Sequence, residues 1–152
     1  MDALTSACSR ITRFPPNSRK VLPLNIATVA PRDDDSKLDL TLVCPVEWTD
    51  YNGHMNVAYY ARAFDIASTA YLSSQASDVR TPSLFRSRID YRREVLEGSA
   101  LRFRVRLLPS ASDSPLQVVI FMTAMPESDG ESYLAAVEMR EFRNSRSIRE
   151  NG

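Results

Sequence analysis

One stretch of nine residues, from Trp48 to Asn56, constrains the fold of this chain more than any other. Its sequence, WTDYNGHMN, places an acid, two amides, a turn glycine and the only histidine of the chain within seven residues. Apolar side chains then recur at helical spacing, and residues 54–81 contain neither glycine nor proline. The pattern predicts a polar turn leading into a long, largely apolar helix with Asn56 as its N-cap. Unpaired N–H groups and the helix dipole favour negative charge at such a place.

The rest of the chain predicts β-strands. Apolar and polar residues alternate, or apolar residues run together, over residues 38–44, 85–95, 101–107, 116–125 and 132–142. The short turns between the last four segments require antiparallel pairing. Pro45 lacks a donor for the ladder, so the first strand is expected at an edge or with a bulge at Pro45. These elements predict an α+β domain, in which four or five antiparallel strands pack on one buried helix.

The two ends of the chain differ from the segment between them. Four prolines and the acidic run Asp33–Asp35 interrupt residues 1–36, where we expect a flexible leader or an extended arm that packs on the domain. The domain is expected over residues 37–143, followed by a polar tail over residues 144–152. Arginines and serines in residues 1–24 resemble those of a transit peptide, so organelle import is an alternative to a cytoplasmic location.

Charge and cysteine usage exclude several classes of function. The formal net charge is zero, so we expect no nucleic acid and no anionic membrane as a partner. The best apolar run, residues 116–125, is too short to span a bilayer. Cys8 and Cys44 make neither a disulfide framework nor a metal cluster, so no metal and a reducing, cytoplasmic compartment are expected. Cys44 lies in an apolar run and is predicted to be a core residue.

The stretch from Asp50 to Asn56 resembles the signature turn of hotdog-fold acyl-CoA thioesterases. Those of the 4-hydroxybenzoyl-CoA type share the pattern Asp-x-x-Gly-His-hydrophobic-Asn followed by an aromatic, which is DYNGHMN followed by Tyr59 here. A longer match, EWTDYNGHMNVAYY and then AFD, is most similar to betainyl-CoA thioesterase-like proteins. The resemblance covers residues 38–142 and implies a hotdog fold, in which a curved antiparallel sheet wraps around one long central helix. It also implies self-association as a homodimer or tetramer.

The resemblance implies roles for four residues in thioester hydrolysis. Asp50 stands where the family has a general base or nucleophile, although it could also serve only to cap the turn. The register of the family makes the Val57 N–H the group that polarises the thioester carbonyl, unless it is an ordinary helix start. Asn52 and His54 match residues that belong to the site in related acyl carrier thioesterases. A purely structural role of His54, bridging the turn to a backbone carbonyl, is equally open.

Further residues around the turn are candidates for binding the substrate. They are Trp48, Gly53, Asn56, Tyr59 and Tyr60. Trp48, Tyr51, Tyr59 or Tyr60 could form an aromatic cage for a quaternary ammonium group, or could simply belong to the core. Trp48 also stands where many relatives carry a second acid.

A second acid and several arginines have ordinary structural explanations. Asp65 is a less favoured catalytic acid, because an ion pair with Arg62, three residues earlier on the helix, would account for it. Rows of arginines on two predicted strands would suit the phosphates of coenzyme A. The favoured interpretation is that these arginines lie on a solvated outer face of the sheet. These rows comprise Arg88, Arg92, Arg102, Arg104 and Arg106.

We therefore expect an acyl-CoA thioesterase that hydrolyses a small acyl-CoA, such as betainyl-CoA, to the free acid and coenzyme A. No cofactor is expected beyond the coenzyme A of the substrate. One alternative is a non-catalytic hotdog module that binds acyl-CoA or serves assembly. A hotdog dehydratase is less favoured, because the histidine context usual for that reaction is not evident.

Overall fold

The structure is a computed structural model that describes residues 25–75, 82–109, 114–128 and 130–143. The first 24 residues of the expected leader or arm (residues 1–36), the polar tail over residues 144–152 and Cys8 lie outside these ranges.

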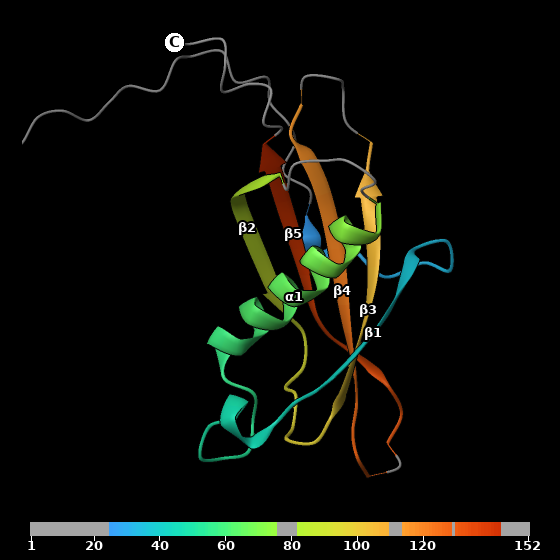
Figure 1. Ribbon diagram of the computed structural model, residues 1–152. Helices are drawn as coiled ribbons and strands as arrows, with labels where there is room; N and C mark the ends of the chain where they lie inside the picture. The colour runs from blue at the N-terminus through green and yellow to red at the C-terminus, as the bar shows by residue number, and fades with distance from the viewer. Residues whose placement is uncertain (1–24, 76–81, 110–113, 129, 144–152) are drawn as a thin grey trace, which may run out of the picture.

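One α-helix and five β-strands make up the described part of the chain (Figure 1). The helix α1 spans Val57–Gln75. The strands are β1 (Ser36–Val43), β2 (Ser83–Tyr91), β3 (Ala100–Leu108), β4 (Leu116–Met125) and β5 (Tyr133–Arg143). Two short 3-10 turns, η1 (Ile26–Thr28) and η2 (Val46–Trp48), precede the helix. The predicted helix and the five predicted strands are therefore confirmed.

The strands form one antiparallel sheet in the order β1-β3-β4-β5-β2. The apolar strand β4 lies at the centre, and β1 lies at an edge, as Pro45 predicted. The register of β1 shifts between Lys37 and Thr41, away from Pro45. The prediction that β2 continues to residue 95 is wrong, because the strand ends at Tyr91. Beyond that point the N–H groups of Arg92 and Arg93 both donate to the Ala135 carbonyl, which bends the chain out of the ladder.

The helix packs across one face of the sheet (Figure 1). Its buried side is apolar apart from Ser68, and Phe64 meets Phe103 of β3 edge to face at 6.4 Å between ring centroids. Alternate residues of the central strands complete this core, among them Ile120 and Met122. Cys44 is fully buried beside them, as predicted. The fold thus holds the N-terminus of α1 and the preceding turn at one end of the sheet.

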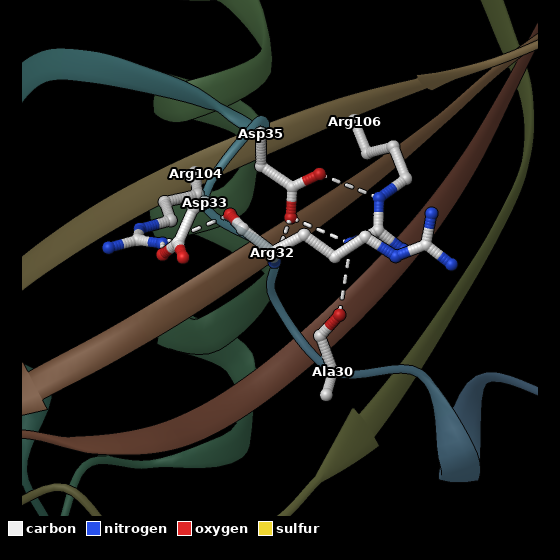
Figure 2. Close-up of polar contacts among 6 residues, drawn as sticks. All are labelled: Ala30, Arg32, Asp33, Asp35, Arg104 and Arg106. Atoms are coloured by element: carbon white, nitrogen blue, oxygen red, sulfur yellow. Dashed lines mark hydrogen bonds and ion pairs between the residues drawn. The ribbon is translucent and has the colours of Figure 1, made fainter.

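Residues 25–35 lie against part of the opposite face of the sheet. Ile26 is fully buried there against a second apolar cluster formed by Val119, Phe121, Val137 and Met139. Asp35 accepts two hydrogen bonds from Arg106, at 2.6 Å from Nε and 2.8 Å from Nη2, as Figure 2 shows. Arg106 also donates to the Ala30 carbonyl at 3.0 Å. Residues 25–35 therefore lie on the outer face as an extended arm.

Candidate active site

The polar turn is held by the side chain that the sequence singles out. Asp50 Oδ1 accepts hydrogen bonds from the Asn52 N–H at 2.8 Å and the His54 N–H at 3.1 Å. The Asp50 N–H donates to the His54 carbonyl at 2.8 Å, which closes the turn. Gly53 has a φ of +73°, where other residues would be strained, and a Cβ there would have no neighbour within 4 Å. The glycine is thus needed for its left-handed backbone, and not for a close approach by another described residue of the chain.

At the start of helix α1, one backbone N–H group has a hydrogen-bond acceptor and another has none within the described ranges. Asn56 Oδ1 accepts a hydrogen bond from the Ala58 N–H at 3.0 Å, which confirms the predicted N-cap. The Val57 N–H has no acceptor among the residues that the structure describes. Because the helix dipole adds to this free donor, the start of α1 presents positive potential to whatever lies before it.

A cleft of about 470 Å³ opens at this helix start. Its first wall comes from the turn and the helix, with Asp50, His54, Met55, Asn56, Val57 and Tyr60. Its second wall follows strand β2, with Tyr91, Arg92, Arg93 and Glu94. A carboxylate, an imidazole and a free backbone donor therefore border one solvent-accessible space.

Long-range hydrogen bonds bring the second wall to the turn. The Met55 N–H donates to the Val95 carbonyl at 2.8 Å, and the Val95 N–H donates to the Tyr60 hydroxyl at 3.1 Å. The Tyr133 hydroxyl donates to the Glu94 carbonyl at 2.7 Å. As a result, Glu94 Oε2 lies 3.4 Å from His54 Nδ1. The sequence analysis missed Tyr91, Arg93 and Glu94 as residues of the cleft, because no local pattern marks them.

The tyrosines of the cleft are uncharged packing groups. Tyr60 and Tyr91 meet edge to face, with ring centroids 5.1 Å apart. Burial raises the pKa of Tyr60, and burial together with the charge of Glu138 raises the pKa of Tyr91. Both phenols therefore stay protonated at neutral pH, so neither serves as a base there.

The predicted aromatic cage does not form within the described chain. Trp48 and Tyr59 stack on each other with ring centroids 5.5 Å apart, and neither lines the cleft. Tyr51 is 96% exposed, so Tyr60 is the one cage candidate that the cleft contains. The reason is helical geometry, since successive residues such as Tyr59 and Tyr60 point about 100° apart. Asn52 and Gly53 shape the turn and likewise do not line the cleft.

The predicted ion pair between Arg62 and Asp65 is wrong. Asp65 Oδ1 instead contacts Arg140 Nη1 of β5 at 3.0 Å. Arg140 is buried and also donates to Glu138 Oε2 at 2.6 Å and to Ser68 Oγ at 2.8 Å. A buried guanidinium needs acceptors far more than an exposed one does. Asp65 is therefore engaged away from the cleft, on the side of the helix that faces β5.

Two of the five arginines considered for phosphate binding, Arg104 and Arg106, contact the arm instead. Arg106 holds Asp35, and Arg104 donates to the Arg32 carbonyl at 3.1 Å, so the arm covers part of the outer face that was expected to be solvated. Arg92 is the one member of those rows that lines the cleft, where it pairs with Asp90. Its Nη2 also donates to the Ile26 carbonyl of the arm at 2.7 Å. Arg93 lines the cleft and packs over the Tyr133 ring at 4.0 Å.

Other kinds of site find no support in the described residues. Those ranges contain no group of three or more His, Cys, Asp or Glu side chains that could hold a metal ion. Burial raises the pKa of the free Cys44 thiol to about 11, with a smaller contribution from Glu97, so this cysteine is a poor nucleophile. In the same ranges, no helix has the length and apolar character needed to cross a membrane.

Comparison with known proteins gives one family and one fold. A family model described as the thioesterase-like superfamily matches residues 44–147. The betainyl-CoA thioesterase of Pseudomonas aeruginosa is 38% identical over 69 residues, a match that covers 41% of this chain and 43% of that enzyme. The chain thus matches less than half the length of this curated relative.

Two solved structures share the architecture of the chain. The hexameric thioesterase y2039 of Yersinia pestis has a TM-score of 0.62 at 16% identity, covering 76% of this chain and 95% of its own. Cj0915, a hexameric hotdog-fold thioesterase of Campylobacter jejuni, has a TM-score of 0.61 at 12% identity, covering 73% and 84% respectively. The helix packed on a five-stranded antiparallel sheet is therefore a hotdog fold, as predicted.

Proposed function

The chain belongs to the thioesterase-like superfamily, and from this premise we propose that it hydrolyses an acyl-CoA thioester to the free acid and coenzyme A. The observation that carries the proposal is the cleft that joins Asp50, His54 and the Val57 N–H. These are a carboxylate, an imidazole and a free donor at a helix start, the groups that thioester hydrolysis uses.

The Val57 N–H is the proposed donor to the thioester oxygen. It borders the cleft and has no acceptor in the described part of the chain. The carbonyl oxygen becomes an anion when a nucleophile adds to its carbon, and the free N–H and the helix dipole stabilise that charge. Because a helix N-terminus is held rigid by its own hydrogen bonds, the donor needs no reorganisation during the reaction.

Asp50 is the proposed base or nucleophile. Its Oδ1 is held by the two turn N–H groups, so the carboxylate has a fixed orientation, and its second oxygen accepts no hydrogen bond from the residues that the structure describes. As a base, Asp50 takes a proton from water, the resulting hydroxide adds to the carbonyl carbon, and the carbon–sulfur bond breaks to release the coenzyme A thiolate. As a nucleophile, Asp50 attacks the carbon itself and expels the coenzyme A thiolate to form a mixed anhydride, which water then hydrolyses to the free acid and the Asp50 carboxylate.

The two ends of the substrate have distinct surroundings in the proposal. A small acyl group would contact Asn56 and the Tyr60 and Tyr91 rings, whose faces also suit the quaternary ammonium of a betainyl group. Arg92 and Arg93 lie at the second wall, and guanidinium groups suit the phosphates of coenzyme A. The betainyl-CoA thioesterase of P. aeruginosa, which resembles this chain over 69 residues, supports such a small polar acyl group.

Self-association as a homodimer or a larger oligomer forms part of the proposal. Strand β2 is an edge of the sheet and carries exposed apolar side chains, with Leu84 41% and Tyr91 47% exposed. Tyr91 also borders the cleft, so a second copy paired at this edge would lie beside the site. Sedimentation of the full chain at micromolar concentration tests this, and a monomer would contradict it. The usage of cysteine supports a reducing, cytoplasmic location.

The release of free thiol tests the proposed reaction. The full chain is incubated with acetyl-, butyryl-, hexanoyl-, benzoyl- and betainyl-CoA, and a thiol reagent reports the coenzyme A produced. Hydrolysis of at least one substrate above the rate of a sample in which Asp50 is replaced by Asn is the expected result. If no substrate is cleaved but acyl-CoA binds, the chain is a non-catalytic binding module instead.

A further inference from the structure

Glu94 lies in the cleft next to the single histidine of the chain. Its carboxylate is 3.4 Å from His54 Nδ1, and both side chains line the cleft together with Asp50. Building on the proposed function, we infer that Glu94 is a positioning residue: it holds His54 in the tautomer that leaves Nε2 as an acceptor for the attacking water.

The backbone frame around Glu94 is rigid, so the contact is built into the fold. The Tyr133 hydroxyl fixes the Glu94 carbonyl from strand β5. The next residue, Val95, is fully buried, donates to the Tyr60 hydroxyl and accepts from the Met55 N–H. An isolated antiparallel β-bridge between the backbones of His54 and Leu96 completes the frame. The turn, the helix and strand β5 thus jointly hold the Glu94 backbone next to the turn, and the Glu94 carboxylate lies beside the imidazole.

The contact selects one tautomer of the neutral imidazole. A carboxylate only accepts hydrogen bonds, so the ring nitrogen beside it is favoured as the N–H donor. With the proton on Nδ1, the other nitrogen, Nε2, keeps its lone pair. The distance of 3.4 Å exceeds that of a strong hydrogen bond, but contacts of this kind tighten when substrate binds. Both side chains keep solvent exposure, 34% for His54 and 74% for Glu94, so little packing opposes this adjustment.

The tautomer of His54 matters because Asp50 alone does not orient the attacking water. The carboxylate of Asp50 accepts one proton of the water, but a single acceptor does not orient the water's lone pair towards the thioester carbon. A second acceptor at His54 Nε2 takes the other O–H as a hydrogen bond and fixes that orientation. In the opposite tautomer Nε2–H donates to the water and competes for the lone pair that must attack. Glu94 therefore acts through His54 and needs no contact with substrate.

The single histidine makes the tautomer directly measurable. The chain is purified without a histidine tag and labelled with ¹⁵N-histidine, so His54 supplies all the ring nitrogen signals. At alkaline pH the two nitrogens of a neutral ring differ strongly in chemical shift according to which one carries the proton. We expect the proton on Nδ1 in the parent protein and a mixture of tautomers in Glu94→Gln, whose amide offers both an acceptor and a donor.

A nearby acid provides the matched control. Glu97 is three residues from Glu94, is exposed, and does not line this cleft, so Glu97→Gln removes the same charge from the same segment. In Glu97→Gln, the tautomer of His54 and the kcat are expected to match those of the parent protein. Glu94→Gln is expected to lower kcat on the best acyl-CoA of the panel by about 10- to 100-fold, as the loss of an orienting partner of histidine does. KM should stay within about twofold, because substrate contacts are unchanged.

The two readouts separate the possible failures. A parent protein with the proton on Nε2, or a tautomer that Glu94→Gln leaves unchanged, overturns the inference even if acyl-CoA is hydrolysed. Equal kcat values for Glu94→Gln and Glu97→Gln overturn the catalytic role of the contact. If the parent cleaves no acyl-CoA, the proposed function fails together with that role, while the tautomer measurement still decides whether Glu94 orients His54.

Discussion

Replacing Asp50 by Asn removes the charge of the turn carboxylate and leaves the turn in place. Asn carries an oxygen where Asp50 Oδ1 accepts from the Asn52 and His54 N–H groups at 2.8 and 3.1 Å. A charged acceptor stabilises each such bond by about 1 kcal/mol more than a neutral one, so the two bonds set an upper limit of about 2 kcal/mol on the loss of stability. Solvent screening at this exposed turn lowers the figure to about 1 kcal/mol, which corresponds to a melting temperature about 3–6 °C lower.

The expected loss of activity is much larger than this loss of stability. Removal of a general base costs roughly 10²–10⁴ in rate, equivalent to about 2.7–5.5 kcal/mol in the barrier. Asp50→Asn should therefore keep its cooperative melting curve and lose at least about a hundredfold in kcat on the best acyl-CoA. The assay is thiol release under saturating substrate, with the melting temperature measured on the same preparation.

Asp65→Asn is the matched control, because its amide oxygen can still accept the hydrogen bond from Arg140, and Asp65 does not line the cleft. Its kcat should stay within about twofold of the parent value. If Asp50→Asn hydrolysed acyl-CoA at the parent rate while Asp65→Asn did not, the catalytic carboxylate would belong to the helix, and the assignment of the turn acid would be wrong.

The arm and its ion pair provide two further predictions. Ile26→Ala should lower the free energy of unfolding by about 2–4 kcal/mol, because Ile26 is fully buried. The loss cannot exceed the free energy with which the arm docks on the sheet, since the arm can detach on its own. An unchanged melting temperature in thermal denaturation would exclude a docked arm. Burial opposes ionisation of Asp35, but hydrogen bonds from Arg106 and the Arg32 N–H outweigh it and lower its pKa. The resulting stabilisation is present above the ordinary value of 3.8 and is lost as the pH falls through the lowered pKa. The melting temperature difference between the parent and Asp35→Asn should therefore shrink in acid, and a constant difference would contradict the assignment.

The arm also connects the outer face of the sheet to the cleft. Arg92 lines the cleft and donates to the Ile26 carbonyl, so one guanidinium contacts both the arm and the second wall of the site. The family match begins at residue 44, so the arm precedes the part of the chain that defines the superfamily. Activity measured on Ile26→Ala would show whether the position of Arg92 matters for hydrolysis.

The turn, the helix and the strands were predictable because local patterns determine them. Asp50, Gly53 and His54 interact within five residues, and the Asn56 cap acts two residues away on Ala58. Such contacts depend on side-chain chemistry at fixed short spacing, which the sequence displays directly. The same locality explains why the N-terminus of α1 and the acid before it could be identified as a candidate site without coordinates.

The partners of these residues were decided by the tertiary structure. Glu94 reaches His54 across 40 residues, Arg140 reaches Asp65 across 75, and Arg106 reaches Asp35 across 71. For Asp65 a local alternative, Arg62, existed and lost to the distant Arg140. Sheet pairing and burial determine which charges end up side by side, and a buried cation such as Arg140 takes whichever acceptors the fold brings to it. The amino-acid sequence alone therefore determined the elements and the turn chemistry, whereas the second wall of the cleft exists only in the folded chain.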